Sequence, residues 1–245
     1  GSGLYPVDLI VTCDYTEVQK CEPFPTPFVL MSFDLETSIL EEKILCAAVV
    51  IQQGSREEIY EFKGSESDIL SGISQLVREK DPDIITGYNI DNFDLPRILA
   101  RSREIGKKGD YTTHADLFGW GRVPILESED TRLIPKRQSN RRNWDIYGRC
   151  VLDAWWQARM VLRPKRETLK YVCSLLWPED EDLQKMDVDA SKMDKEWEER
   201  PDVVMEYCVQ DTILPLRILT QIRAVQTKEA LASVAAVPLE VAISG

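Results

Sequence analysis

The chain has 245 residues, 43% of them hydrophobic, and a formal net charge of −12. This length suits one large domain with a proper core, and no apolar run approaches the ~20 residues that cross a membrane. We recognise no signal peptide, and we interpret Gly1-Ser2-Gly3 as a cloning remnant. The six cysteines are scattered without a C-x-x-C pair, which indicates a reducing compartment and argues against a structural zinc.

The charged residues narrow the chemistry further. The chain has a single histidine, His114, which argues against most metalloproteases, Ser-His-Asp hydrolases and His-based nucleases. We therefore expect its chemistry to depend on carboxylates. The acidic balance argues against a high-affinity nucleic-acid binder, because phosphate contacts need a basic footprint. A DNA-handling function is compatible with this charge only if acidic residues hold metal ions or other domains supply the basic surface.

The first half of the chain is predicted to alternate strands with helices. Residues 4–27 are Pro-rich and are expected to hold one short strand, Leu9–Cys13. Beyond them, the spacing of apolar residues distinguishes strands from helices. In chain order it predicts strands Phe28–Glu36, Ile44–Gln52 and Glu57–Phe62, helix Ser67–Lys80, strand Asp83–Tyr88 and helix Asp94–Ile105.

The second half begins with a polar insertion over residues 107–148, which we expect to contain a hairpin. The elements predicted after it are strand Cys150–Asp153, helices Ala154–Val161 and Glu167–Leu176, an acidic loop Pro178–Glu199, helix Asp202–Ala224 and a helical tail to about Ala235. Strands followed by helices mixed with further strands predict an α/β domain with a mixed sheet.

Asp34 and Glu36 stand two residues apart in the predicted strand Phe28–Glu36. Alternate residues of a strand share a face, so these carboxylates point the same way. Their repulsion and desolvation would be costly unless a divalent cation neutralised both. The alternative is a strand end that reaches solvent, and this pair alone does not decide between the two.

Two further acidic positions follow. Asp94 opens a predicted helix, where a carboxylate gains from the helix dipole or simply caps the helix, which is the commoner role. Tyr207 and Asp211 lie four residues apart and therefore on one helical face. Pro215 removes the backbone hydrogen bond to the Asp211 carbonyl and predicts a local kink. Taken alone, each position is better explained by capping or by amphipathic packing.

Taken together, the order Asp-x-Glu, Asp, Tyr-x-x-x-Asp resembles the exonuclease motifs of the DEDDy group. The chain is similar to the 3′→5′ exonuclease domain of family B DNA polymerases, above all the archaeal and eukaryotic delta-like ones. The segments that carry the resemblance are Met31–Thr37, Asp81–Pro96 and Tyr207–Leu219, with Gly148-Arg149, Asp153 and Ala230–Val241 in support. Arg97 departs from the pattern, since the family usually has an aromatic there, and the stretch between Glu36 and Ile44 is shorter than typical.

The resemblance implies a ribonuclease H-like mixed sheet flanked by helices, with a β-hairpin insertion, and two Mg²⁺ or Mn²⁺ ions as cofactors. Asp34, Glu36 and Asp211 would hold one ion, and Asp34 would bridge to the second with support from Asp94. Tyr207 would orient the attacking water together with Glu36. Hard cations with oxygen ligands fit magnesium better than zinc.

The resemblance also implies a domain organisation and partners. Residues 1–27 would be the cloning remnant and part of an N-terminal region, 28–224 the exonuclease domain and 225–245 a helical lead towards a palm domain. The palm motifs do not occur in the sequence, so we do not expect polymerase activity from this chain. The expected partners are the 3′ end of single-stranded DNA, the remaining polymerase domains or subunits and, through them, a sliding clamp. The expected location is nuclear in a eukaryote and nucleoid-associated in an archaeon or bacterium.

Contacts with DNA are expected at two places. Asn89 and Phe93, next to Asp94, could contact the strand or its terminal base, although Phe93 could equally pack in the core. The second place is a run of four cations in the insertion, here called the hairpin cations: Lys136, Arg137, Arg141 and Arg142. A solvated loop is the alternative explanation for such a run.

Two other functions remain open. One is a catalytically silent module that binds DNA or organises a polymerase, and the other is an RNA-processing exonuclease of the same fold. The intact acidic residues and Tyr207 argue against the first. The polymerase-like sequence around Asp94 and Asp211 argues against the second.

Overall fold

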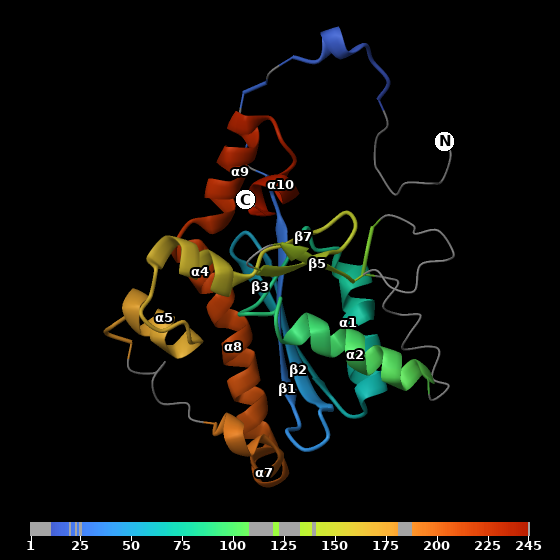
Figure 1. The fold of residues 1–245 in the computed structure, drawn as a ribbon, viewed down its shortest axis with the longest axis vertical. Helices are drawn as coiled ribbons and strands as arrows, with labels where there is room; N and C mark the ends of the chain where they lie inside the picture. The colour runs from blue at the N-terminus through green and yellow to red at the C-terminus, as the bar shows by residue number, and fades with distance from the viewer. Residues whose placement is uncertain are drawn as a thin grey trace.

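The computed structural model describes residues 11–19, 21–22, 24, 26–107, 120–122, 133–138, 141–180 and 188–244. Within them, a five-stranded sheet runs through the centre of the molecule (Figure 1). Its strands are β1 (Val29–Thr37), β2 (Ile44–Gln53), β3 (Arg56–Lys63), β4 (Ile84–Thr86) and β7 (Cys150–Val151), in the order β3-β2-β1-β4-β7. β1, β2 and β3 pair antiparallel, whereas β4 pairs parallel with β1 and β7. The predicted mixed sheet is confirmed.

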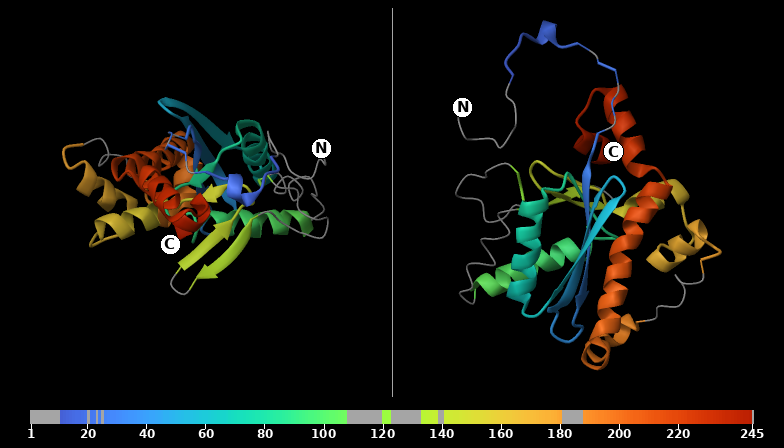
Figure 2. Two further views of the ribbon diagram at one scale, coloured as in Figure 1. Left: turned by 90° about the horizontal axis from the view of Figure 1, so that it is seen from above. Right: turned by 180° about the vertical axis from the view of Figure 1, so that it is seen from behind.

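Helices cover both faces of this sheet (Figure 2). On one face lie α1 (Glu66–Lys80) and α2 (Asp94–Lys107), and on the other lies the long helix α8 (Pro201–Gln221). Around α8 are arranged α4 (Ala154–Leu162), α5 (Leu169–Leu176), α7 (Met193–Glu199) and α9 (Ala224–Ala235). Helix α10 (Leu239–Ser244) packs against α9 and β7. None of the helices in the described ranges is long and apolar enough to cross a membrane.

Strand β1 divides the two layers of the core. Met31, Phe33 and Leu35 are buried in one cluster with apolar residues of α1 and α2. The alternate residues face the other way, towards α8. Asp34 is paired across the sheet with Ala48, which belongs to a second cluster together with Cys208 of α8. The period of two along β1 therefore aims its acidic residues at α8.

The predicted hairpin is present as β5 (Ile134–Gln138) and β6 (Arg141–Asp145), which pair antiparallel. Residues 108–119, 123–132 and 139–140 of the expected insertion, His114 among them, lie outside the described residues. The prediction of a short strand at Leu9–Cys13 is wrong for the residues that the structure describes, since Val11–Cys13 form no strand. A 3-10 turn, η1 (Tyr15–Glu17), follows instead, and its N-cap is Asp14.

Two predictions near the C-terminal half need correction. The expected acidic loop Pro178–Glu199 ends in a 3-10 turn, η3 (Ala190–Lys192), and in helix α7. Burial of Met193 and packing of Trp197 anchor α7 to the second cluster, despite its acidic sequence. The long helix stops at Gln221 rather than Ala224, because Arg223 adopts a left-handed conformation with φ 53°. Helix α10 lies within residues 225–245, the segment that was expected to be helical.

Candidate active site

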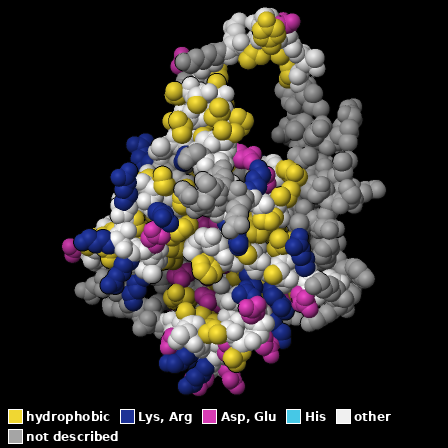
Figure 3. Space-filling model, in the orientation of Figure 1, with side chains coloured by type: hydrophobic (Ala, Val, Ile, Leu, Met, Phe, Trp, Pro, Cys, Tyr) yellow, Lys and Arg dark blue, Asp and Glu magenta, His cyan; other side chains and the backbone are white. Residues whose placement is uncertain are grey.

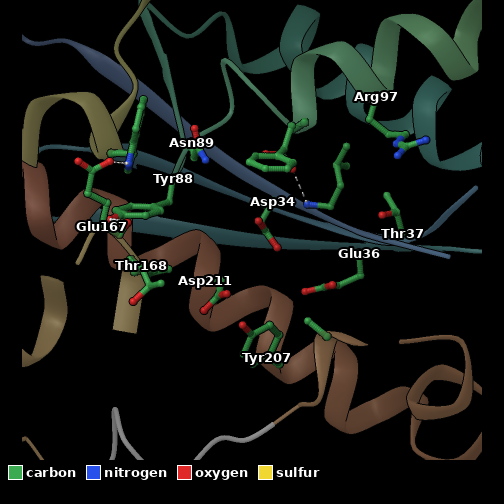
Figure 4. Close-up of a pocket in the computed structure, with 16 residues that line it drawn as sticks. Asp34, Glu36, Thr37, Tyr88, Asn89, Arg97, Glu167, Thr168, Tyr207 and Asp211 are labelled. Atoms are coloured by element: carbon green, nitrogen blue, oxygen red, sulfur yellow. Dashed lines mark hydrogen bonds between the residues drawn. The ribbon is translucent and has the colours of Figure 1, made fainter. Parts of the chain in front are cut away.

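Strand β1 supplies two carboxylates on the face towards α8. Glu36 is 9% exposed, and its cross-strand neighbour is Cys46, while that of Asp34 is Ala48. Small neighbours leave room beside the two carboxylates. Figure 4 shows both side chains reaching from the strand towards α8. The expectation that Asp34 and Glu36 share a strand face therefore agrees with the structure, and these residues do not lie at a solvated strand end.

Asp94 joins them from the first turn of α2. Asp94 is 6% exposed as a residue, and its carboxylate accepts a hydrogen bond of 3.2 Å from the backbone N–H of Leu35 in β1. Asp94 thus ties the start of α2 to the strand between the two acidic residues. The close approach depends on Gly87, since a Cβ there would lie 2.6 Å from the carbonyl oxygen of Phe33.

The loop between β4 and α2 is held by Asp153, which is fully buried. Its carboxylate accepts backbone hydrogen bonds from Asn89 at 2.8 Å and Asp91 at 3.0 Å. It also caps α4 by accepting from the N–H of Trp155 at 2.9 Å. These three bonds fix the path of the chain into Asp94, including the left-handed Asn89 with φ 65°. The sequence placed Asp153 in a motif but did not reveal this positioning role.

Helix α8 closes the site from the opposite side. Tyr207 and Asp211 lie one turn apart on it, and Figure 4 shows both facing Asp34 and Glu36. The helix continues through Pro215 to Gln221. Residues from β1, α2 and α8, far apart in the sequence, therefore converge. We call Asp34, Glu36, Asp94 and Asp211 the carboxylate cluster.

An open pocket of about 700 Å³ contains the carboxylate cluster and Tyr207. Its wall includes groups that the sequence did not single out, among them Tyr88, Trp155, Glu167 and Thr168. The indole N–H of Trp155 donates to Glu167 at 3.1 Å. The sequence did contain a signal for this wall: two adjacent tryptophans followed by Arg159 at helical spacing. In the structure, the guanidinium of Arg159 lies 5.5 Å from the ring centre of Trp155.

Burial and mutual repulsion perturb the carboxylate cluster strongly. Burial, followed by the charges of Asp94, Glu36 and Asp211, raises the pKa of Asp34 well above its usual range. Burial is also the main cause that raises the pKa of Glu36 to about 9, of Asp94 to about 7 and of Asp211 to about 6. Burial and the Asp211 carboxylate raise the pKa of Tyr207. The apo site therefore disfavours full ionisation, and a bound cation would relieve that cost.

The donor set fits a hard divalent cation, because carboxylate oxygens are the ligands such ions prefer. One softer atom lies close by. A donor oxygen of Asp34, one of Glu36 and the Sγ of Cys208 all lie within 4.8 Å of one another. The Cys208 thiol, however, donates to the backbone oxygen of Asp34 at 3.5 Å and packs in the second cluster. The oxygen donors therefore dominate the site, in agreement with magnesium or manganese chemistry.

The residues expected to contact DNA fall in two different places. Asn89 and Phe93 line the pocket, and Phe93 is 67% exposed, so it does not pack in the core. The hairpin cations lie on β5 and β6, and among the described side chains neither Lys136 nor Arg142 lines this pocket. Lys136 pairs with Asp145 and lies 4.0 Å from Glu240, while Arg142 is exposed. The side chains of Arg137 and Arg141 are outside the described residues.

Comparison with known proteins identifies the family of this chain. Residues 50–172 match the family described as DNA polymerase family B, exonuclease domain. The chain belongs to this family. It is 30% identical to the DNA polymerase delta catalytic subunit of Drosophila melanogaster over 87% of the chain, and 29% identical to that of Bos taurus over 88%. These matches span 22% and 18% of the two relatives, so the chain corresponds to about a fifth of their length.

A solved structure supports the same fold. The family B DNA polymerase of the archaeon Pyrobaculum calidifontis superposes with a TM-score of 0.65 at 21% identity, over 91% of this chain and 28% of that one. The family match covers Asp94 but ends before Tyr207 and Asp211 and begins after Glu36. The family B exonuclease fold is therefore established, whereas the roles of the individual site residues are matters for proposal.

Proposed function

We propose that this exonuclease domain is a metal-dependent 3′→5′ exodeoxyribonuclease that releases nucleotides from single-stranded or mismatched 3′ ends, as the proofreading part of a DNA polymerase. The convergence of four carboxylates from β1, α2 and α8 around one open pocket carries the proposal. The delta-type relatives are named as polymerase catalytic subunits, which supports DNA as the substrate.

The carboxylate cluster would hold two Mg²⁺ or Mn²⁺ ions, with Asp34, Glu36 and Asp211 as ligands of one and Asp34 and Asp94 as ligands of the other. Ions bound there would polarise the scissile phosphodiester and lower the pKa of a water molecule. Burial and repulsion raise the pKa values in the cluster, which supports the proposal because a bound cation would relieve both costs.

The chain's own residues would then orient the reactants. Tyr207 faces Asp211 and the β1 carboxylates, so its hydroxyl can donate to, and thereby orient, a water molecule held beside Glu36. The raised pKa of Tyr207 keeps the hydroxyl protonated at neutral pH, as a donor must be. Phe93, exposed at the pocket wall, offers a face on which a terminal base can stack.

One digestion experiment tests this function. DNA and RNA oligonucleotides labelled at the 5′ end are incubated with the protein, with and without Mg²⁺. A ladder of shortened labelled DNA that requires Mg²⁺ is the expected result. Preferred digestion of RNA would instead indicate an RNA-processing exonuclease. DNA binding without any hydrolysis would indicate a silent module.

The wider setting is part of the proposal. Residues 28–224 would form the exonuclease unit with the hairpin as its insertion, and 225–245 would lead towards a palm domain. The other polymerase domains, and a sliding clamp reached through them, would deliver the primer end. Location would follow the polymerase, in the nucleus of a eukaryote or at the nucleoid of an archaeon or bacterium.

A further inference from the structure

A basic segment lies beside the candidate active site of this acidic protein. Residues Arg159–Lys170, here called the basic segment, contain five cations and one carboxylate, Glu167. The five cations are exposed: Arg159, Arg163, Lys165, Arg166 and Lys170. They run from the end of α4 through the loop into α5. Figure 3 shows Lys and Arg side chains gathered on the left of the molecule, over the region of α4 and α5.

Most of this positive charge is not neutralised locally. Arg159 lies over the rings of Trp155 and Trp156 and pairs with Glu167 at 3.4 Å. In contrast, neither Arg166 nor Lys170 forms an ion pair with any carboxylate of the described residues. The hairpin cation Lys136 differs, since it is paired with Asp145. Free cations on an acidic protein mark the place where a polyanion would experience the least repulsion.

A second pocket, of about 410 Å³, opens beside these two cations. We call it the α5 pocket, and its lining combines charge, aromatic rings and hydroxyls: Arg166, Thr168, Lys170, Tyr171, Ser174, Trp177 and Asp180. Asp180 is the one carboxylate of that lining. Trp177 packs against a buried cluster, whereas Tyr171 belongs to none of the clusters.

The α5 pocket adjoins the active-site pocket. Thr168 lines both of them, and its position is fixed because its side chain caps α5 by accepting from the N–H of Tyr171 at 3.3 Å. A strand whose 3′ end lies at the carboxylate cluster can therefore pass Thr168 into the α5 pocket without crossing the body of the protein. Cations together with aromatic rings are the combination that single strands bind without sequence preference.

We propose that the α5 pocket is a subsite for the nucleotides upstream of the scissile bond, with Arg166 and Lys170 on the phosphates and Tyr171 or Trp177 stacked on a base. The proposal rests on the proposed exonuclease function and specifies its substrate as a single strand several nucleotides long. It also adds a basic footprint beside the active-site pocket of a protein whose net charge is −12.

The test compares three proteins: the parent, Arg166→Ser/Lys170→Ser, and the control Arg56→Ser/Lys63→Ser, which removes two exposed cations from the distant edge strand β3. Binding of a labelled oligothymidylate is measured across a salt series in Ca²⁺ without Mg²⁺. Two lost phosphate contacts should flatten the salt slope by about 1.4 units relative to parent and control. A third variant, Tyr171→Ala, should weaken binding by at least about 5-fold if its ring stacks on a base.

Hydrolysis rates measured in Mg²⁺ distinguish a loss of binding at this subsite from a loss of catalysis at the carboxylate cluster. A dinucleotide occupies the carboxylate cluster without reaching the α5 pocket, so its kcat/KM should be the same in parent and variant, while KM for the long strand rises in the variant. Parallel salt slopes for the parent and the Arg166→Ser/Lys170→Ser variant would overturn the proposal. Competition by thymidine monophosphate that requires Arg166 and Lys170 would also overturn it, because the α5 pocket would then be a site for the released product. Failure of the exonuclease function would appear separately, as no hydrolysis by any of the proteins. If circular dichroism shows misfolding, Arg166→Gln/Lys170→Gln replaces the serine variant.

Discussion

Removal of the buried Asp153 carboxylate should destabilise the protein more than any surface substitution. In Asp153→Ala, the N–H groups of Asn89, Asp91 and Trp155 lose their acceptor. A buried donor left unsatisfied costs about 1–3 kcal/mol, and the bonds of Asn89 and Trp155 are only partly buried, so they cost less than that of Asp91. Relief of the repulsion that Asp153 exerts on Asp94 recovers a further part. We therefore expect the free energy of unfolding to fall by roughly 3–5 kcal/mol.

Urea unfolding followed by circular dichroism measures this loss. The control is Asp189→Ala, which removes a carboxylate that caps the turn η3 by accepting from Ser191. Loss of that exposed cap should lower the free energy of unfolding far less than loss of the buried Asp153 carboxylate. Asp153→Ala should also lower exonuclease activity, since the loop that carries Asp94 loosens. A loss below about 1 kcal/mol for Asp153→Ala would refute the positioning role, because the three hydrogen bonds would then be dispensable.

Three further predictions concern the site and its surroundings. Tyr207→Phe should keep metal and DNA binding but slow single-turnover hydrolysis by up to about 10²-fold, and parent-like rates would exclude the hydroxyl from the chemistry. Folding raises the pKa values of Glu36, Asp94 and Asp211 to between about 6 and 9, and it also raises the pKa of Asp34. The stabilising contribution of these groups is therefore present below their unfolded pKa values and is lost as pH rises through the folded ones. The metal-free protein should therefore lose at least about 2 kcal/mol of unfolding free energy between pH 5 and pH 9, whereas a flat urea midpoint would contradict the burial of these groups. Replacing the four hairpin cations by serine should flatten the salt slope of DNA binding by about 2 units, since Lys136 is already paired, and an unchanged slope would show that the hairpin lies away from the strand.

The sequence predicted which elements carry the candidate site residues, because each motif sits on a regular element. The alternation along β1 sets the faces of Asp34 and Glu36, and the four-residue spacing on α8 sets those of Tyr207 and Asp211. The residue spacing did not predict that these elements contact one another. That expectation came from the family resemblance. The structure shows them converging at one pocket.

What the sequence missed depends on contacts between distant segments. Asp153 bonds residues more than sixty positions away, and nothing local in its sequence marks that role. Helix α7 forms because Met193 and Trp197 find a cluster to pack against, which the acidic composition of the segment conceals. The basic segment was overlooked for a related reason. The hairpin run is denser in cations, but Lys136 there is paired, whereas Arg166 and Lys170 pair with no carboxylate in the part of the chain that the structure describes.

The most direct test of the account is Mg²⁺-dependent hydrolysis of 5′-labelled single-stranded DNA by Asp34→Ala/Glu36→Ala. Glu57→Ala/Glu61→Ala is the matched control, because it removes two exposed carboxylates from the edge strand β3 and changes the net charge equally. The account predicts that the first variant folds, is at least as stable without metal as the parent, and loses at least roughly 10³-fold in rate, while the control hydrolyses DNA as the parent does. Hydrolysis at the parent rate by Asp34→Ala/Glu36→Ala, with Mg²⁺ still required, would contradict the assignment of the carboxylate cluster as the metal site.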